Sequence, residues 1–243
     1  TKTVRKRTSL GPRPGPRLPS GRGIRGFYYN GAMTRPLPRS FYARPTLTVA
    51  RELLGSVLAR RLPGGEILRG RIVETEAYVG EEDKACHARA GRTPRTDVMY
   101  GPPGIAYVYL TYGMHHLLNA VAEREGFPAA VLIRAAEPLE GLPRMARARG
   151  TDRPHLLMSG PAKLCQALGL NLEQNREDLR GRVVWIEEGD SIPDRAVATS
   201  PRIGCQTVAP PWDRIPWRMF LAGHPFVTPG RPRQTQTRGG KAQ

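Results

Sequence analysis

The chain has 243 residues, of which 39% are hydrophobic, and its formal net charge is +17. A chain of this length and composition can bury a sizeable apolar core, which excludes a wholly disordered protein. The sequence contains no run of roughly 18 apolar residues, so we expect an intracellular protein without a membrane partner. Its three cysteines and five histidines lack metal-ligand spacing, and we expect neither a metal nor another cofactor.

The positive charge is concentrated at the two ends of the chain. Residues 1–51 contain twelve Lys and Arg and no acid, and residues 214–243 contain six and no acid. We therefore predict a disordered basic arm over 1–35, one folded domain over 36–230 and a disordered basic tail over 231–243. Basic ends favour binding to nucleic acid, although they can also serve only for solubility. The excess of Arg over Lys, 33 against 5, favours a bacterial source.

The first part of the predicted domain contains one helix and one hairpin. A short helix is expected from Leu47 to Leu54, with Thr46 as its cap and Gly55 as its stop. The segments "SVLARRL" and "EILRGRIVETEAY" flank "PGG", which predicts two antiparallel strands joined by a turn. Residues 79–104 then form a loop that is too long for a simple connector and is typical of a functional segment.

The second part adds further strands and two helices. "IAYVYLTYGMHHLLNAVA" predicts a hairpin that turns near Gly113, "PAAVLIRAAEP" a buried strand, and "VVWIEEG" and "WRMFLAGHPFV" two more strands. Helices are expected from about Leu139 to Arg149 and in "SGPAKLCQALGL", where Ser159 is the expected cap and Gly169 the terminator. The fold class predicted is α+β: a single domain with a curved, largely antiparallel sheet, a protruding β-hairpin and several surrounding helices.

Two carboxylates interrupt the strand "GRIVETEAY". Because side chains alternate along a strand, one face carries Ile72, Glu74, Glu76 and Tyr78, and the other Val73, Thr75 and Ala77. We expect the carboxylate face to line a cleft or solvent, and a solvated strand face is the simpler interpretation. Tyr78 beside Glu76, followed by a loop that bears His87, instead favours a pocket.

Two polar side chains lie in otherwise apolar strands. A buried Arg134 would need a carboxylate partner such as Glu76 or Glu137. Asn119 is either a satisfied core amide or part of a site, and the sequence leaves both open.

Three tyrosines fall close together in the second hairpin. Tyr107, Tyr109 and Tyr112 could be cross-strand packing residues, which is the commoner use of tyrosine in a sheet. Beside a basic loop they could instead contact nucleic acid, with one ring wedged between bases and others stacked on an extruded base.

Four motifs together carry a family resemblance. "RGRIVETEAY", "PGIAYVYLTYGM", "IRAAEPLEGL" and "SGPAKLCQAL" occur in this order between about Pro38 and Phe226. Together they resemble the alkyladenine (3-methyladenine) DNA glycosylase family of the non-helix-hairpin-helix type. The resemblance implies a monomeric, monofunctional base-excision-repair enzyme whose partner is duplex DNA carrying a damaged purine. Such an enzyme flips 3-methyladenine, 7-methylguanine, hypoxanthine or ethenoadenine out of the duplex and hydrolyses its N-glycosidic bond, leaving an abasic site.

The resemblance also implies a role for each residue that matches a motif. Glu76 matches the carboxylate that activates water, and Arg134 the arginine beside that water. The other matches are the base-pocket residues Tyr78, His87, Tyr109 and Asn119, the intercalating Tyr112 with its neighbour Met114, and the weak phosphate contacts Lys163 and Ser159. Asn119 corresponds to the side chain that helps to reject guanine.

Three alternatives remain at this stage. Carboxylates two residues apart on a strand lie about 6.6 to 6.8 Å apart, within the roughly 6.5 to 9.5 Å of inverting sugar hydrolases. In those enzymes, however, the two acids flank the substrate. A non-catalytic DNA-binding protein would need the tyrosines but not Glu76, and Lys163 could act as a Schiff-base nucleophile. Glu74 has no assigned task; it pairs with an arginine or holds the strand edge.

Overall fold

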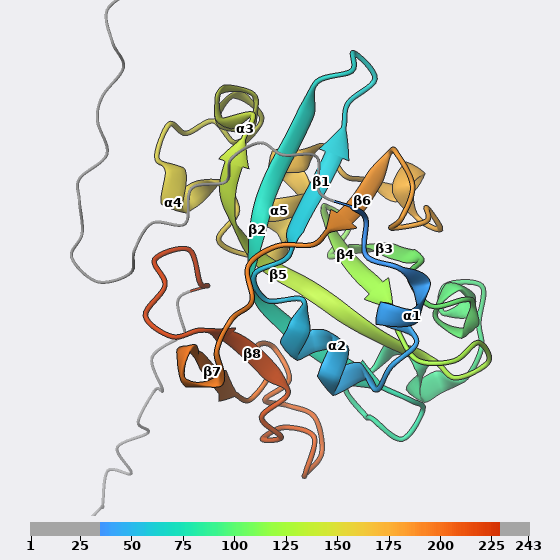
Figure 1. Ribbon diagram of the computed structural model, residues 1–243. Helices are drawn as coiled ribbons and strands as arrows, with labels where there is room; N and C mark the ends of the chain where they lie inside the picture. Colours follow the sequence, from blue (N-terminus) through green and yellow to red (C-terminus); the bar gives the residue numbers. More distant parts are fainter. Residues whose placement is uncertain (1–34, 229–243) are drawn as a thin grey trace, which may run out of the picture. The chain divides into compact units, whose positions relative to one another are not determined.

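Figure 1 shows a computed structural model of the chain, in which residues 35–228 are described. The predicted basic tail, and all but the last residue of the predicted basic arm, lie outside the described residues. The helices are α1 (Arg39–Tyr42), α2 (Thr46–Glu52), α3 (Leu142–Arg149), α4 (Pro154–Leu157) and α5 (Pro161–Leu168). The strands are β1 (Val57–Arg61), β2 (Ile67–Val79), β3 (Ala106–Thr111), β4 (His115–Val121), β5 (Ala129–Glu140), β6 (Val184–Glu187), β7 (Val197–Ser200) and β8 (Arg218–Leu221).

The eight strands of residues 35–228 all join one sheet, and every pairing between them is antiparallel. The main order is β3-β4-β5-β2-β1-β6, while β8 pairs with β2 and β7 pairs with β8. Helix α2 packs against β2 and β5, and helix α5 packs against β4 and β5. These findings confirm the predicted α+β class and the antiparallel sheet. Within residues 35–228, no helix has both the length and the apolar character that crossing a membrane requires.

The long strand β2 is the element on which the sheet is built. Its first half pairs with β1, Glu74–Glu76 pairs with β8, and β5 runs along its other edge. The register with β5 shifts on both sides of Glu74, so that neither Val73 nor Arg134 has a residue directly opposite it. Irregularities of this kind re-aim a side chain without ending the strand. They occur here where β2 and β5 carry their buried charges.

The second hairpin and the loop before it agree with the sequence expectations. Strands β3 and β4 pair, and the turn between them contains Tyr112 and Gly113, whose φ angles are 51° and 68°. The loop 79–104 contains two short 3-10 helices, His87–Ala90 and Asp97–Tyr100. Side chains from both short helices form an apolar cluster with Tyr107 and with residues of β4 and β5. The loop is therefore a packed part of the domain.

Several predicted boundaries and caps were wrong. The first helix begins at Thr46, after Pro45, and the Thr46 hydroxyl donates to Glu123 at 2.7 Å instead of capping the helix. Leu139 and Glu140 continue β5, and α3 begins only after Gly141. The residue that precedes α5 is Gly160, not Ser159, and no side chain caps that helix. Gly169 does end α5, in the left-handed conformation.

The last two predicted strands are shorter than their sequence segments, and one strand was missed. Of "WRMFLAGHPFV", only Arg218–Leu221 is a strand, because a turn follows at Gly223. Strand β7, Val197–Ser200, was not predicted. Its four residues are half-buried or exposed and show no clear alternation, so its pairing with β8 has little local signal.

Candidate active site

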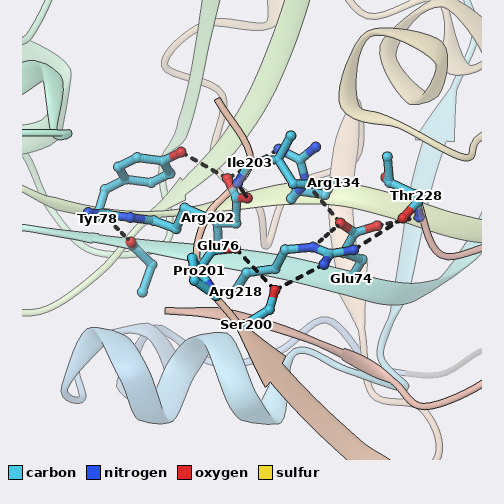
Figure 2. Close-up of polar contacts among 11 residues, drawn as sticks. Glu74, Glu76, Tyr78, Arg134, Ser200, Pro201, Arg202, Ile203, Arg218 and Thr228 are labelled. Atoms are coloured by element: carbon cyan, nitrogen blue, oxygen red, sulfur yellow. Dashed lines mark hydrogen bonds and ion pairs between the residues drawn. The ribbon is translucent and has the colours of Figure 1, made fainter. Parts of the chain in front are cut away.

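The second carboxylate of the β2 motif lies at the centre of a hydrogen-bonded cluster (Figure 2). Glu76 is fully buried. Its Oε2 accepts hydrogen bonds from the Tyr78 hydroxyl at 2.8 Å and from Arg134 Nη1 at 3.1 Å, while its Oε1 accepts one from the Ile203 amide at 2.7 Å. The three donors come from β2, β5 and the segment after β7. The carboxylate is therefore held by groups from three parts of the sequence.

Arg134 bridges the carboxylates of Glu76 and Glu74. Its Nε donates to Glu74 Oε1 at 2.9 Å, and its Nη1 to Glu76. Arg218 Nε also donates to Glu74 Oε1, at 2.7 Å. We call Glu74, Glu76, Arg134 and Arg218 the ionic cluster. Burial alone would lower the pKa of Arg134, but the charges of Glu76 and Glu74 raise it, so the guanidinium stays charged.

Of the two carboxylate partners predicted for Arg134, the structure confirms Glu76 but not Glu137. Arg134 binds Glu76, as expected. Glu137 instead pairs with Arg71, and the Nε atom of Arg71 lies 2.9 Å from Oε2 of Glu137. The second carboxylate partner of Arg134 is Glu74, for which the sequence had predicted no role. The interpretation of the β2 carboxylates as a solvated strand face is wrong, because both are fully buried. Burial of two acidic side chains is tolerated when each is paired with a cation and hydrogen-bonded, as both are here.

Tyr78 is fixed by an arginine that the sequence did not single out. The guanidinium carbon of Arg202 lies 4.7 Å from the centre of the Tyr78 ring. Arg202 itself is buried and bound by both oxygens of the buried Asp83, at 2.5 and 2.8 Å. Burial, followed by the charge of Glu76, raises the pKa of Tyr78 well above its usual range. Its hydroxyl therefore stays protonated and donates to Glu76.

A second group of predicted residues gathers around Tyr107 on the hairpin. His87 Nδ1 lies 2.9 Å from the Tyr107 hydroxyl, and the His87 ring meets the Tyr109 ring edge to face with centroids 4.6 Å apart. Asn119 is buried, and its Nδ2 donates to the Tyr107 carbonyl at 3.1 Å. Tyr78 and Tyr109 pack against the same apolar cluster. The structure thus brings all four predicted base-pocket residues to one end of β2 and the β3-β4 hairpin.

His87 is a neutral side chain at neutral pH. Burial, with the charges of Arg95 and Arg89, lowers the pKa of His87 from 6.5 to about 4. The Arg95 guanidinium lies 5.1 Å from the centre of the Tyr109 ring. We call Tyr78, His87, Tyr107 and Tyr109 the aromatic group. The positive charge beside this group is therefore on Arg95 and not on the imidazole of His87.

The remaining predicted residues lie at the hairpin tip and at the start of α5. Tyr112 and Met114, at the tip of the β3-β4 hairpin, are 89% and 70% exposed. Lys163 is half-buried in the first turn of α5, and Ser159 is 5% exposed beside Ala135 of β5. Among residues 35–228, no three His, Cys, Asp or Glu side chains are grouped so that they could hold a metal ion.

Sequence reasoning missed the supports of the cluster, namely Arg202, Asp83, Arg218 and the Ile203 and Thr228 amides. Four of the five lie after residue 200, far from β2 in the sequence, and Asp83 lies in the loop that directly follows β2. An isolated arginine in a loop has no periodicity that distinguishes it from a surface residue. A charge count offers one faint signal, since two acids buried on one strand require more than one cation.

Comparisons with known proteins show the family to which the chain belongs. The sequence profile described as "Methylpurine-DNA glycosylase (MPG)" matches residues 40–225. A protein of Myxococcus xanthus is 51% identical over 196 residues, which are 81% of this chain and 95% of that protein. One of Chlorobaculum tepidum is 46% identical over 206 residues, 84% of this chain and 97% of its own length. Both are named "Putative 3-methyladenine DNA glycosylase". The family resemblance predicted from the four motifs is confirmed.

Proposed function

We propose, for a chain that belongs to the methylpurine-DNA glycosylase family, that Glu76 activates the water molecule that cleaves a damaged purine from duplex DNA. The protein is a DNA glycosylase. The observation that carries the proposal is the buried Glu76 carboxylate, which accepts hydrogen bonds from Arg134, Tyr78 and the Ile203 amide. A carboxylate fixed by three hydrogen-bond donors in this way is suited to general base chemistry.

The proposed reaction is a monofunctional hydrolysis. Glu76 takes a proton from water, the water oxygen bonds to C1′ of the sugar, and the N-glycosidic bond breaks with its electron pair moving to the purine. An alkylated, cationic purine leaves as a neutral molecule, whereas a neutral purine such as hypoxanthine must also gain a proton as it leaves. The transition state resembles an oxocarbenium ion, as in other glycoside cleavages, and the negative carboxylate also stabilises that charge. Arg134 holds the carboxylate and lies beside the water. The product is an abasic site in an uncut strand.

The aromatic group is proposed to hold the purine after it leaves the base stack. Alkylation at N3 or N7 makes the purine a cation, and aromatic rings attract cations by about 0.5 to 2 kcal/mol each. Tyr78, Tyr109 and His87 would contact the base. A neutral His87 favours this role, since a protonated imidazole would repel a cationic base. The proposed substrates are 3-methyladenine, 7-methylguanine, hypoxanthine and ethenoadenine.

Asn119 and the hairpin tip are proposed to provide selection and extrusion. Asn119 is buried and tied to the Tyr107 carbonyl, so its amide could not move to accommodate the 2-amino group of undamaged guanine. Tyr112, with Met114 beside it, would enter the duplex and fill the space left by the extruded base. Lys163 is proposed as a weak phosphate contact, and the enzyme is proposed to act as a monomer.

The test is a labelled duplex with one hypoxanthine, incubated with protein and then treated with alkali. We expect a cut at the lesion only after alkali, and a single-turnover rate about 100 to 10,000-fold lower in Glu76→Gln. Glu137→Gln, a carboxylate paired with Arg71 outside the site, is the matched control. A normal rate in Glu76→Gln would refute the mechanism. A covalent adduct trapped by borohydride would instead identify an amine nucleophile such as Lys163.

A further inference from the structure

Glu74 is a buried acid with three donors and no contact with the proposed reacting groups. It is 0% exposed. Its Oε1 accepts from Arg134 Nε at 2.9 Å and Arg218 Nε at 2.7 Å, and its Oε2 accepts from the Thr228 amide at 2.6 Å (Figure 2). These donors lie on β5, on β8 and after β8. A side chain bound by three distant segments has one position only.

The hydrogen bonds divide the Arg134 guanidinium between the two acids. A guanidinium is planar and rigid, so fixing its Nε edge also fixes the direction of its Nη groups. Glu74 holds the Nε edge, and Nη1 then lies 3.1 Å from Glu76 Oε2. Glu74 consequently sets the position from which Arg134 Nη1 donates to Glu76.

The ionic cluster is also balanced in charge. It contains two carboxylates and two guanidiniums, with side-chain exposures of 0% for the acids and 7% for the arginines. Charges at this depth interact more strongly than charges in water. Without the charge of Glu74, Glu76 would share the cluster with two cations, and a carboxylate beside excess positive charge holds protons more weakly.

We propose that Glu74 is a positioning residue for catalysis, which orients Arg134 towards Glu76 and balances the charge of the ionic cluster. The proposal rests on the proposed function of Glu76. Glu74 itself would touch neither the water nor the purine, and it would act only through Arg134 and through the charge balance.

Few other groups near Glu76 can titrate in the acidic range. The pKa values of Tyr78 and Cys205 are raised, chiefly by burial, so both stay protonated there. Arg134 donates to Glu76 Oε2, and its raised pKa keeps it charged. His87, with a pKa of about 4, contacts Tyr107 and Tyr109 instead of Glu76, and its contribution is common to all variants.

The experiment measures single-turnover excision of 7-methylguanine from a duplex between pH 4.5 and 9 at rising protein concentrations. This cationic purine leaves without needing a proton, so the acidic limb of the rate profile reports the base. In Glu74→Gln we expect the maximal rate to fall about 10 to 100-fold, by analogy with the outer-shell residues that orient metal-binding side chains. The acidic limb should move to lower pH, and the protein concentration for half-maximal rate should change less than about twofold.

A second variant carries the opposite charge change. Arg218→Gln removes a cation from the cluster, and the acidic limb is expected to move to higher pH. This variant keeps the test decisive if Glu74→Gln fails to fold. Glu74→Asp, which keeps the charge, should recover part of the lost rate, and Glu137→Gln should behave as the parent. Thermal unfolding confirms that each variant is folded.

The two proposals fail in different ways. If Glu76→Gln is inactive while a folded Glu74→Gln keeps the parental rate and profile, the positioning role is overturned and the proposed function stands. If the acidic limbs of the pH–rate profiles of Glu74→Gln and Arg218→Gln move in the same direction, the charge-balance argument is overturned. A fully active Glu76→Gln overturns the proposed function and this inference with it.

Discussion

The ionic cluster and the tip of the β3-β4 hairpin are built in opposite ways. The cluster is buried and charged, and it is assembled from strands far apart in the sequence. The tip is exposed and apolar, with Tyr112 89% and Met114 70% exposed, and it is formed by neighbouring residues in one turn. The proposed chemistry therefore depends on the whole sheet, whereas the proposed insertion depends on a local turn. Changes in the cluster should affect stability and rate, and changes at the tip should affect DNA binding alone.

The largest expected effect comes from removing the arginine that joins the two acids. Arg134→Met leaves Glu76 with two of its three donors and Glu74 without one of its cations. Breaking a buried ion pair on one side costs about 3 to 5 kcal/mol in the free energy of unfolding. Chemical denaturation measures this loss. The control for a surface ion pair is Arg214→Met, which removes an exposed arginine paired with Asp213. It should lower the free energy of unfolding by less than about 1 kcal/mol.

An intermediate effect is expected at the hairpin tip. Tyr112 has a φ of 51°, a conformation that asparagine adopts more readily than tyrosine. Tyr112→Asn should therefore leave the thermal midpoint of unfolding unchanged or higher. Loss of a stacking ring should weaken binding to a lesion-bearing duplex by about 1 to 3 kcal/mol, or about 5 to 150-fold. Tyr112→Phe should retain the affinity, and Leu172→Ala, an exposed apolar residue in a different segment, should have no effect. A destabilised Tyr112→Asn would break the distinction between tip and cluster.

The smallest effect concerns His87, which lies between the two regions. Its pKa is lowered from 6.5 to about 4. Between these values the unfolded chain binds a proton that the folded protein does not, so stability should fall as the pH falls from 6.5 to 4. Denaturation midpoints measured across this range should decline less steeply in His87→Gln than in the parent. His155→Gln, at an exposed position of α4, is the control. Equal slopes in His87→Gln and the parent would contradict this prediction.

The elements with strong local patterns were predictable from the sequence. The β1-β2 and β3-β4 hairpins have turn residues between alternating segments, and α5 ends at Gly169, whose left-handed conformation favours glycine. The weak pattern of β7 gave no prediction. The expected cap Thr46 failed because its hydroxyl found a tertiary partner, Glu123, which no local rule includes.

The candidate site was predictable as a set of residues but not as a network. Alternation along β2 correctly placed Glu74 and Glu76 together, and both reach Arg134. Alternation could not say that this face is buried, since burial comes from β8 and the segment after it. The roles of the residues came from the family resemblance, and they remain proposals.

The bond between Glu74 and the Thr228 amide spans 154 positions of the chain. During synthesis the N-terminal parts of a protein emerge first. Strands β1, β2 and β5 can pair while Arg218 and Thr228 are still absent, and Glu74 then keeps its water until β8 arrives. The acid that we assign to positioning is thus among the last groups to be enclosed, and a product of premature termination before residue 218 would contain every proposed catalytic residue without a finished site.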